Sequence, residues 1–214
     1  MLAPIGVLDM AHPEADLAVA KASAAEDVPF IFSSQASVDM ETCSSVMGNS
    51  PRWFQLYWST SDDLVESFVR RAESCGCEAI VLTLDTTMLG WRPRDLDLNY
   101  LPFLRGRGIA QYTSDPVFRE LMKTSLGDAD EPPKLTWESI KALIKMAQNY
   151  PGGFWGNLLS DDPRRAVKTF IECYSRPSLT WEDLSFLRSL TDLPILLKGI
   201  LSANDARKAI ERDM

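Results

Sequence analysis

The sequence predicts an α/β fold, specifically an incomplete TIM (β/α)₈ barrel. Short apolar segments alternate with amphipathic helical segments, and the first four apolar segments end at Asp9, Ser33, Tyr57 and Asp85, which are 24, 24 and 28 residues apart. Such repeats, with strands apolar on both faces, indicate a parallel sheet covered by helices. Every strand ends in polar residues, which favours a barrel over a doubly wound sheet because a barrel gathers all strand ends around one site. The first βα turn also lacks a GxGxxG dinucleotide-binding motif.

The first 85 residues predict four strands and three helices. The strands are expected at Leu2–Leu8, Pro29–Ser33, Arg52–Trp58 and Ala79–Asp85. The helices are expected at Glu14–Ala25, Ser37–Met47 and Asp62–Cys75. Apolar residues of the third helix recur on one face, and a glycine ends it. These residues are Leu64, Val65, Phe68, Val69, Ala72 and Gly76.

Residues 86–178 lack this rhythm and are rich in Pro, Asp, Arg and Trp, which predicts a long insertion after the fourth strand. Within it, Lys134–Asn149 has a helical pattern behind a Thr136 cap. Afterwards the sequence predicts a helix from Thr180 to Leu190, a fifth strand at Pro194–Leu197 and a last helix from Ser202. A closed barrel needs eight strands. We therefore expect residues 1–214 to form a single partial barrel domain, truncated at both ends, with about five of eight βα units.

The composition excludes several classes of protein. Hydrophobic residues make up 45% and charged residues 24%, the net charge is −8 and the pI is near 4.7. This acidic, globular composition opposes a nucleic-acid or anionic-membrane partner. No apolar run reaches the roughly 20 residues of a membrane helix. Four cysteines without a CxxC pair, and one histidine, predict reduced thiols, a cytoplasmic location and no metal site.

Five sequence blocks together resemble a known family. They are LAPIG, FSSQAS, FQLYW, LTLDT and LLKGIL, in this order. In this order and spacing they are similar to the flavin-binding blocks of the FMN-dependent 2-hydroxy-acid dehydrogenases and oxidases. The WRPRDLDLNYLPF stretch and the insertion resemble the lactate 2-monooxygenase branch most. The resemblance implies FMN as cofactor, a small, lactate-like L-2-hydroxy acid as substrate, O₂ as acceptor, and complete members that are homo-oligomeric.

The resemblance also implies which residues bind the cofactor. The backbone of Pro4, Ile5 and Gly6 is expected to lie against the flavin, where a glycine permits close approach. Ser33, Gln55 and Thr83 match positions that hydrogen-bond the edge of the isoalloxazine ring, and neutral hydroxyls and amides can match its alternating donors and acceptors. Lys198 matches the lysine beside flavin N1, where a cation stabilises the reduced, anionic ring.

Each of these residues also has a structural alternative. The glycine could serve a strand-to-loop turn, the neutral polar residues could cap strands, and Lys198 could pair with Asp85 inside the barrel mouth.

Two residues match the family's substrate site. Tyr57 matches a substrate-contacting tyrosine, and Arg92 matches an arginine whose guanidinium clamps the substrate carboxylate. Arg94 is close enough in sequence to take that role instead, and Asp95 could hold the arginines in a surface salt-bridge cluster. Trp91 stands where glycolate oxidases often have a basic residue, which disfavours glycolate as substrate.

The catalytic base expected of the family is not in this sequence. The one histidine, His12, lies in MAHPEAD and is expected to serve helix entry. The family's base histidine lies in an SNHGGRQ-like block on the strand after the one that bears Lys198, and its FMN phosphate is held further on by DGG and GR blocks. None of these blocks follows Lys198 in this sequence. We therefore expect no catalytic residue in the chain, little activity of this fragment alone, and exposed sheet edges that promote association.

Two alternatives stay open at this point. One is a non-catalytic remnant of the same fold that binds a partner, and the other is a phosphate-binding barrel lyase in which Lys198 forms a Schiff base.

Overall fold

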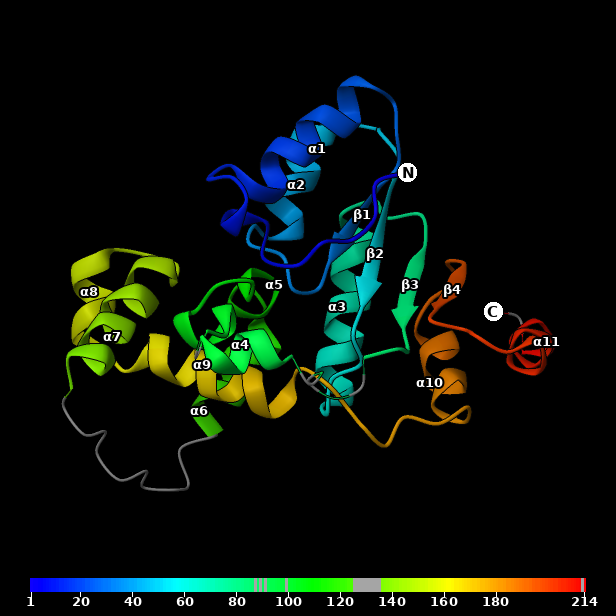
Figure 1. Ribbon diagram of the computed structural model, residues 1–214. Helices are drawn as coiled ribbons and strands as arrows, with labels where there is room; N and C mark the ends of the chain where they lie inside the picture. The colour runs from blue at the N-terminus through cyan, green and yellow to red at the C-terminus, as the bar shows by residue number, and fades with distance from the viewer. Residues whose placement is uncertain (87, 89, 91, 99, 125–135, 213) are drawn as a thin grey trace.

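A parallel sheet forms the centre of the computed structural model, which describes residues 1–214 except 87, 89, 91, 99, 125–135 and 213 (Figure 1). Within the described residues the sheet has four strands in chain order. They are β1 (Phe30–Ser33), β2 (Arg52–Leu56), β3 (Ile80–Thr83) and β4 (Ile195–Lys198). The strands β1 and β3 are buried along their whole length, as expected of a parallel sheet covered on both faces. In β4 only Ile195 is buried.

The predicted strand at Leu2–Leu8 is wrong except at its first residue. Leu2 forms an isolated bridge with Phe30: its N–H donates to the Pro29 carbonyl at 2.7 Å, and its carbonyl accepts from Ile31 N–H at 3.1 Å. Beyond that point Pro4 has no N–H to donate, and Val7 takes a left-handed φ of 56°, so the chain turns into the short helix η1 (Leu8–Met10). An apolar run alone does not reveal these two interruptions.

The three helices predicted in the first half are confirmed, with small shifts at their ends. They are α1 (Ala15–Ala25), α2 (Met40–Met47) and α3 (Asp62–Ser74). Helix α2 begins at Met40 because the Asp39 carboxylate caps it, accepting from Thr42 N–H at 2.8 Å. The predicted apolar face of α3 is fully buried against the sheet and its neighbours.

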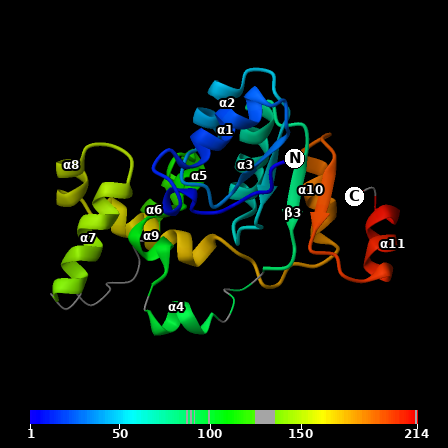
Figure 2. The same cartoon turned by 45° about the horizontal axis from the view of Figure 1, so that its top comes forward.

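Residues from the predicted insertion form mostly helices. They are α4 (Pro93–Asp97), η2 (Pro102–Arg105), α5 (Ala110–Thr113), α6 (Pro116–Thr124), α7 (Trp137–Asn149), α8 (Phe154–Leu159) and α9 (Asp162–Cys173). In Figure 1 helices α5 to α9 lie together to one side of the sheet, and Figure 2 shows α4 apart from them. Thr136 caps α7, accepting from Ser139 N–H at 3.1 Å, which confirms the predicted cap, whereas Lys134 lies outside the described residues.

The chain returns to the sheet through α10 (Asp183–Leu190), β4 and α11 (Ala203–Glu211). Helix α10 begins at Asp183, three residues after Thr180. The predicted contact between these two residues is present, since the Asp183 carboxylate accepts hydrogen bonds from Thr180 N–H at 2.7 Å and Thr180 Oγ1 at 2.9 Å, as in one half of a capping box. Ser202 caps α11 as predicted, accepting from Asp205 N–H at 3.1 Å.

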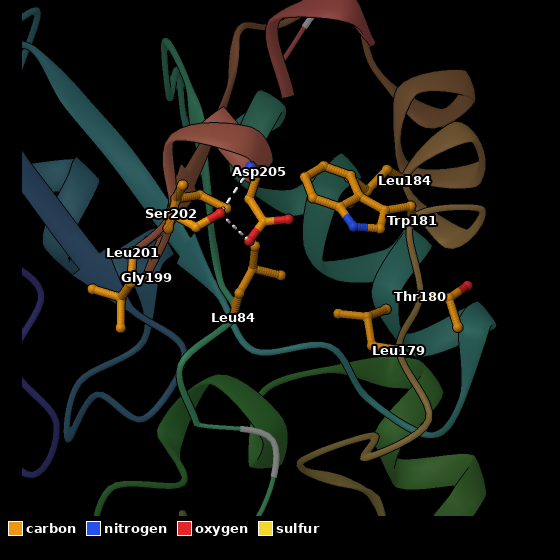
Figure 3. A pocket seen from close by; sticks show the side chains of 10 residues that line it. Leu84, Leu179, Thr180, Trp181, Leu184, Gly199, Leu201, Ser202 and Asp205 are labelled. Carbon is orange, nitrogen blue, oxygen red and sulfur yellow. Dashed lines mark hydrogen bonds between the residues drawn. The ribbon is translucent and has the colours of Figure 1, made fainter. Parts of the chain in front are cut away.

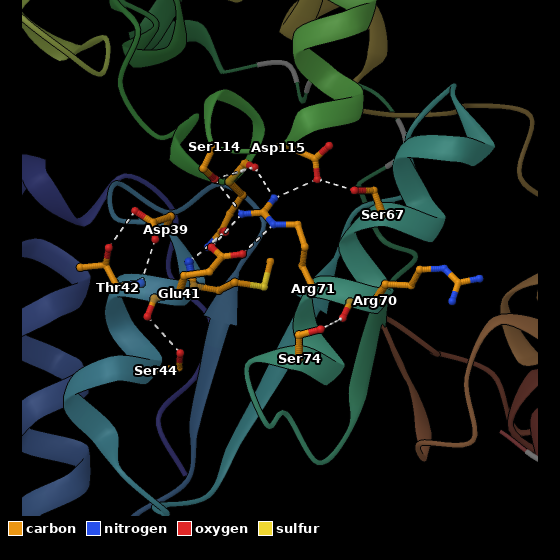
Figure 4. Close-up of polar contacts among 12 residues, drawn as sticks. Asp39, Glu41, Thr42, Ser44, Ser67, Arg70, Arg71, Ser74, Ser114 and Asp115 are labelled. Atoms are coloured by element: carbon orange, nitrogen blue, oxygen red, sulfur yellow. Dashed lines mark hydrogen bonds and ion pairs between the residues drawn. The ribbon is translucent and has the colours of Figure 1, made fainter.

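Arg71 on α3 ties the sheet side of the molecule to the helices of residues 86–178 (Figure 4). Its guanidinium donates to Glu41 on α2 at 2.7 and 2.9 Å, to Asp115 at 2.9 Å and to the Gln111 carbonyl at 2.7 Å. Asp115 is fully buried and also accepts from Ser67 at 2.7 Å. The ion pairs therefore fix α2, α3 and the α5–α6 segment relative to one another.

Candidate functional site

Three neutral polar side chains form a continuous hydrogen-bonded row across the carboxyl ends of neighbouring strands. Ser33 Oγ on β1 donates to Gln55 Oε1 on β2 at 3.2 Å, and Gln55 Nε2 donates to Thr83 Oγ1 on β3 at 2.9 Å. Ser33 pairs with Gln55 in the sheet register, which sets their side chains side by side. All three are 2–3% exposed. This Ser33–Gln55–Thr83 row connects residues that lie 22 and 28 positions apart in sequence.

Lys198 continues the row on β4, where it pairs with Thr83 in the sheet register. Its Nζ lies 2.9 Å from Asp85 Oδ2, so the pairing with Asp85 considered above is present. Both side chains are partly open to solvent, at 45% and 41% exposure. Gly199 follows with a φ of 106°, and a Cβ there would lie 2.8 Å from Asp85 Cβ. Glycine at this position therefore lets β4 pass close to Asp85.

Gly6, Tyr57 and Arg92 line one cavity of about 380 Å³. The cavity lies between the segment around Gly6, the end of β2 and the beginning of the predicted insertion. Tyr57 follows β2 directly, and its backbone N–H donates to Ser34 Oγ at 3.3 Å. Arg92 is 66% exposed and lies 3.6 Å from Asp95, so the salt bridge considered in the sequence is also present. A guanidinium with this much freedom can still turn toward a carboxylate.

The structure therefore brings the predicted residues together in two groups. The row and Lys198 share the ends of the strands, whereas Gly6, Tyr57 and Arg92 share the cavity. Pro4 and Ile5 lie in neither group, and Ile5 is 54% exposed. Arg94 is exposed on α4 and is not among the described residues that line the cavity. Trp91 lies outside the described residues.

Sequence reasoning missed three aromatic residues of the cavity, Tyr100, Phe103 and Tyr174. Phe103 lies within the quoted WRPRDLDLNYLPF stretch, so it could have been found there. Tyr174 is the C-cap of α9, 117 residues after Tyr57 in the sequence, and no local pattern marks it. Burial raises the pKa of Tyr174, and Tyr57, which lines the same cavity, raises it further.

His12 has a structural contact, in line with helix entry. Its Nδ1 accepts a hydrogen bond from Glu14 N–H at 3.2 Å, just before α1. Among the described residues no three His, Cys, Asp or Glu side chains gather closely enough to hold a metal ion. In the same part of the chain, no helix is long and apolar enough to cross a membrane.

Two further cavities lie apart from the predicted residues. One of about 390 Å³ lies between α10 and the β4–α11 connection and is lined mainly by apolar side chains (Figure 3). Another, of about 510 Å³, lies between the start of α2 and the segment around Arg107. Neither contains the Ser33–Gln55–Thr83 row, Tyr57 or Arg92.

Comparison with known proteins identifies the family. The model of the FMN-dependent dehydrogenase family matches residues 1–214. The chain belongs to this family. The match confirms the resemblance seen in the five sequence blocks. FMN is the cofactor of this family. Its enzymes are oxidoreductases.

Several FMN-dependent dehydrogenase relatives cover nearly the whole chain. An FMN-dependent alpha-hydroxy acid dehydrogenase of Schizosaccharomyces pombe is 35% identical over 100% of the chain, and an L-lactate oxidase of Lysinibacillus sphaericus is 35% identical over 98%. A crystal structure of mandelate oxidase with (S)-4-hydroxymandelic acid superimposes with a TM-score of 0.66 and 29% identity over 98% of the chain. The chain spans 46%, 45% and 47% of these proteins, respectively, which is a little under half of their length.

The donor set of the row fits the edge of a flavin ring. Among the described hydrogen bonds, Gln55 uses one of its two Nε2 hydrogens, and Thr83 Oγ1 accepts that bond while keeping its own hydrogen. Two donors therefore remain for ring carbonyls, in an environment of low dielectric where each bond is strengthened. The described residues thus fit FMN through its ring edge.

Proposed function

We propose that the whole protein is an FMN-dependent oxidoreductase that oxidises the CH–OH group of a small L-2-hydroxy acid, with O₂ as acceptor. The observation that carries this proposal is the Ser33–Gln55–Thr83 row, continued by Lys198 at the end of β4. Neutral donors along three strand ends and a cation on the fourth match the polar edge of a flavin. Family membership supports the same reading.

The row and Lys198 act on the cofactor in different ways. Hydrogen bonds from Gln55 and Thr83 orient the ring, while the Lys198 ammonium offsets negative charge on the ring's pyrimidine side. When bound, FMN would supply the acceptor for the two electrons that leave the substrate carbon, and the Lys198 ammonium would favour that transfer. Asp85 at 2.9 Å holds the ammonium at the end of β4 before the cofactor binds.

Arg92 and Tyr57 bind the substrate in this proposal. The Arg92 guanidinium pairs with the carboxylate, and the Tyr57 hydroxyl hydrogen-bonds a substrate oxygen within the same cavity. Contacts of two protein groups with two different oxygen-bearing groups of a small acid fix the orientation of that acid. The sequence favoured a lactate-like side chain, and the relatives include both a lactate oxidase and a mandelate oxidase.

The group that removes the substrate's hydroxyl proton lies outside this chain in our proposal. His12 is exposed and bonded to Glu14, and no other histidine exists in the 214 residues. Since the chain spans under half of its relatives' length, we assign the general base and the FMN phosphate site to the part it does not cover. Loss of a general base lowers rates by roughly 10²–10⁴-fold or more, so turnover by the chain alone should be slight.

Flavin titration tests this assignment. If the chain recognises the ring edge, FMN and riboflavin should bind with affinities within about threefold of each other, since neither gains from a phosphate site. Replacing Lys198 by Met should weaken both at least tenfold, because a charge-assisted contact is lost. Quenching of flavin fluorescence on titration with protein measures both affinities.

Lys21→Met is the matched control for Lys198→Met. Lys21 is 53% exposed on α1 and pairs with Glu14, far from the row, so flavin affinity should not change. Equal weakening by both variants, or no flavin binding by the folded chain, would contradict the proposed role of the row.

The Schiff-base alternative is disfavoured by the surroundings of Lys198. A lysine that attacks a carbonyl is activated by desolvation or by a neighbouring cation. Lys198 instead is 45% exposed and pairs with a carboxylate. Within the proposal we also place the protein in the cytoplasm, supported by its four free cysteines.

A further inference from the structure

The cavity that contains Tyr57 and Arg92 has one polar end and one aromatic wall. Arg92 and Asp95 are its charged lining residues. Phe103 and Tyr174 form the aromatic wall, and Val7, Met10, Leu101 and Pro102 extend its apolar surface. The neutral polar or hydroxyl-bearing side chains of the lining are those of Gln35, Tyr57, Thr86 and Tyr100. A substrate whose carboxylate meets Arg92 therefore has the Tyr57 hydroxyl for a second oxygen and apolar and aromatic side chains for its carbon side chain.

The aromatic wall is held rigidly from behind. The rings of Phe103 and Tyr174 each lie 5.1 Å from the ring of Phe170 on α9, at interplanar angles of 39° and 21°. Phe170 is 1% exposed and packs edge-on against Tyr112 at 4.8 Å. Burial on all sides leaves Phe170 no room to move, so the two wall rings keep their positions.

The wall comes from residues outside the repeated βα units. Phe103 belongs to η2, and Tyr174 ends α9, both within residues 86–178. Tyr57, by contrast, follows β2. The side-chain end of the cavity is thus built by the predicted insertion, while the flavin-side residues come from the sheet.

We propose that Phe103 and Tyr174 determine substrate specificity by selecting 2-hydroxy acids that carry an aromatic side chain. Flat rings pack against an aryl group by edge or face, and such contacts add to the hydrophobic gain. The methyl group of a lactate-like acid would leave most of the wall without a contact. An aryl group that fills this surface should change the ratio of the affinities for the two acids by about tenfold or more. This inference rests on the function proposed above, because it takes Arg92 as the carboxylate site.

The test compares two probes, (S)-mandelate and L-lactate, on the full 214-residue chain with saturating FMN. Binding is measured by isothermal titration calorimetry, so no turnover is required. We expect mandelate to bind at least tenfold tighter than lactate. Phe103→Leu and Tyr174→Leu should each reduce that ratio severalfold by weakening mandelate alone, with lactate affinity within about twofold.

Two controls separate specificity from folding. Tyr174→Phe keeps the ring and should keep the preference, while Leu104→Ala changes a 43% exposed neighbour outside the described cavity lining and should have no effect. Circular dichroism spectra of all variants should superimpose on that of the parent chain.

The outcomes separate the two proposals. FMN binding together with equal or tighter binding of lactate overturns the aromatic specificity and leaves the flavin assignment intact. Parallel loss of both acids in the Leu variants also overturns it. Failure to bind FMN, or either acid, overturns the proposed function itself and this inference with it.

Discussion

Asp16 shows how one residue can make the stability of the fold depend on pH. It lies on α1 with 2% exposure, and its carboxylate accepts hydrogen bonds from the backbone N–H groups of Ser37 at 2.8 Å and Val38 at 3.1 Å. Burial raises the pKa of Asp16 to about 6, against the opposing effect of these two bonds. The folded state therefore favours the protonated side chain more than the unfolded state does.

The sign of the pH dependence follows from that raised pKa. The pKa of Asp16 is higher in the folded state than in the unfolded state. The stability that protonated Asp16 contributes to the fold is therefore fully present below about pH 4 and is lost as the pH rises through about 6. The contribution of Asp16 to the free energy of unfolding should fall by on the order of 3 kcal/mol over that range. Asp16→Asn should remove this fall, as measured by urea unfolding at pH 4, 5, 6 and 7. Asp27→Asn, at an exposed residue just after α1, should leave it in place; a similar loss there would contradict the assignment.

Helix α3 carries two neighbouring arginines that differ in how much they contribute to the stability of the fold. The Arg71 side chain is 13% exposed and contacts fully buried Asp115, whereas Arg70 is 67% exposed and pairs with Glu66 on the same helix. Asp115 also accepts from Val117 N–H at 2.8 Å and Phe118 N–H at 3.1 Å, at the start of α6. Arg71 thus neutralises a carboxylate that organises another element.

Replacing Arg71 should destabilise the fold much more than replacing Arg70. Arg71→Met leaves the Asp115 carboxylate buried without its cation and should lower the free energy of unfolding by about 3 kcal/mol. Arg70→Met removes a solvent-exposed pair and should change it by less than about 0.5 kcal/mol. Chemical denaturation of both variants measures the difference. Equal effects would show that the Arg71–Asp115 pair does not link the elements.

The elements differ in how well sequence predicts them, for physical reasons. Helix α3 was predicted almost to the residue because its apolar face and terminal glycine agree, and the structure adds a Ser61 cap at its start. The strand predicted from Leu2 failed because hydrophobicity does not report a missing N–H at Pro4 or the left-handed Val7. The capping contact predicted between Thr180 and Asp183 is present, although the regular turns of α10 begin only at Asp183.

The parts of the candidate site that could be predicted from sequence are the strand ends and, through the quoted blocks, Gly6 and Arg92. The five sequence blocks located the row residues because each stands at a strand end, and the sheet register then brings them together. For the aromatic wall, Phe103 could have been found in the WRPRDLDLNYLPF stretch, but no local pattern predicts that it lies near Tyr174. Phe103 and Tyr174 meet only through Phe170, and contacts between segments about 70 residues apart depend on tertiary packing that local patterns do not encode.

At the scale of the whole molecule, the sheet ends in an incompletely covered strand. The strand β1, at one edge, is buried and bridged by Leu2. The strand β4, at the other edge, has Leu196 37% exposed and Lys198 also exposed. Leu201, just beyond β4, is 97% exposed beside the apolar cavity shown in Figure 3. An open strand edge next to exposed apolar surface favours association.

The chain should therefore self-associate as its concentration rises. Leu201→Lys places a charge beside β4 and should shift the equilibrium toward monomer, as measured by sedimentation equilibrium over a range of concentrations. Leu159→Lys changes a residue that is 88% exposed on α8, away from the sheet, and should have little effect. A monomer at every concentration, with a sharp thermal transition, would contradict this expectation.

The sheet register also has a consequence for the order in which the chain folds. β1, β2 and β3 pair across short separations, since Phe30 meets Arg52 and Phe54 meets Ile80, whereas β3 meets β4 through Ile80 and Ile195, 115 residues apart. Closing so long a loop costs more chain entropy before any contact compensates for it, and distant pairings form slowly. β4 should join last, after residues 86–178 have collapsed. Lys198 would then reach the Ser33–Gln55–Thr83 row only in the final step of folding.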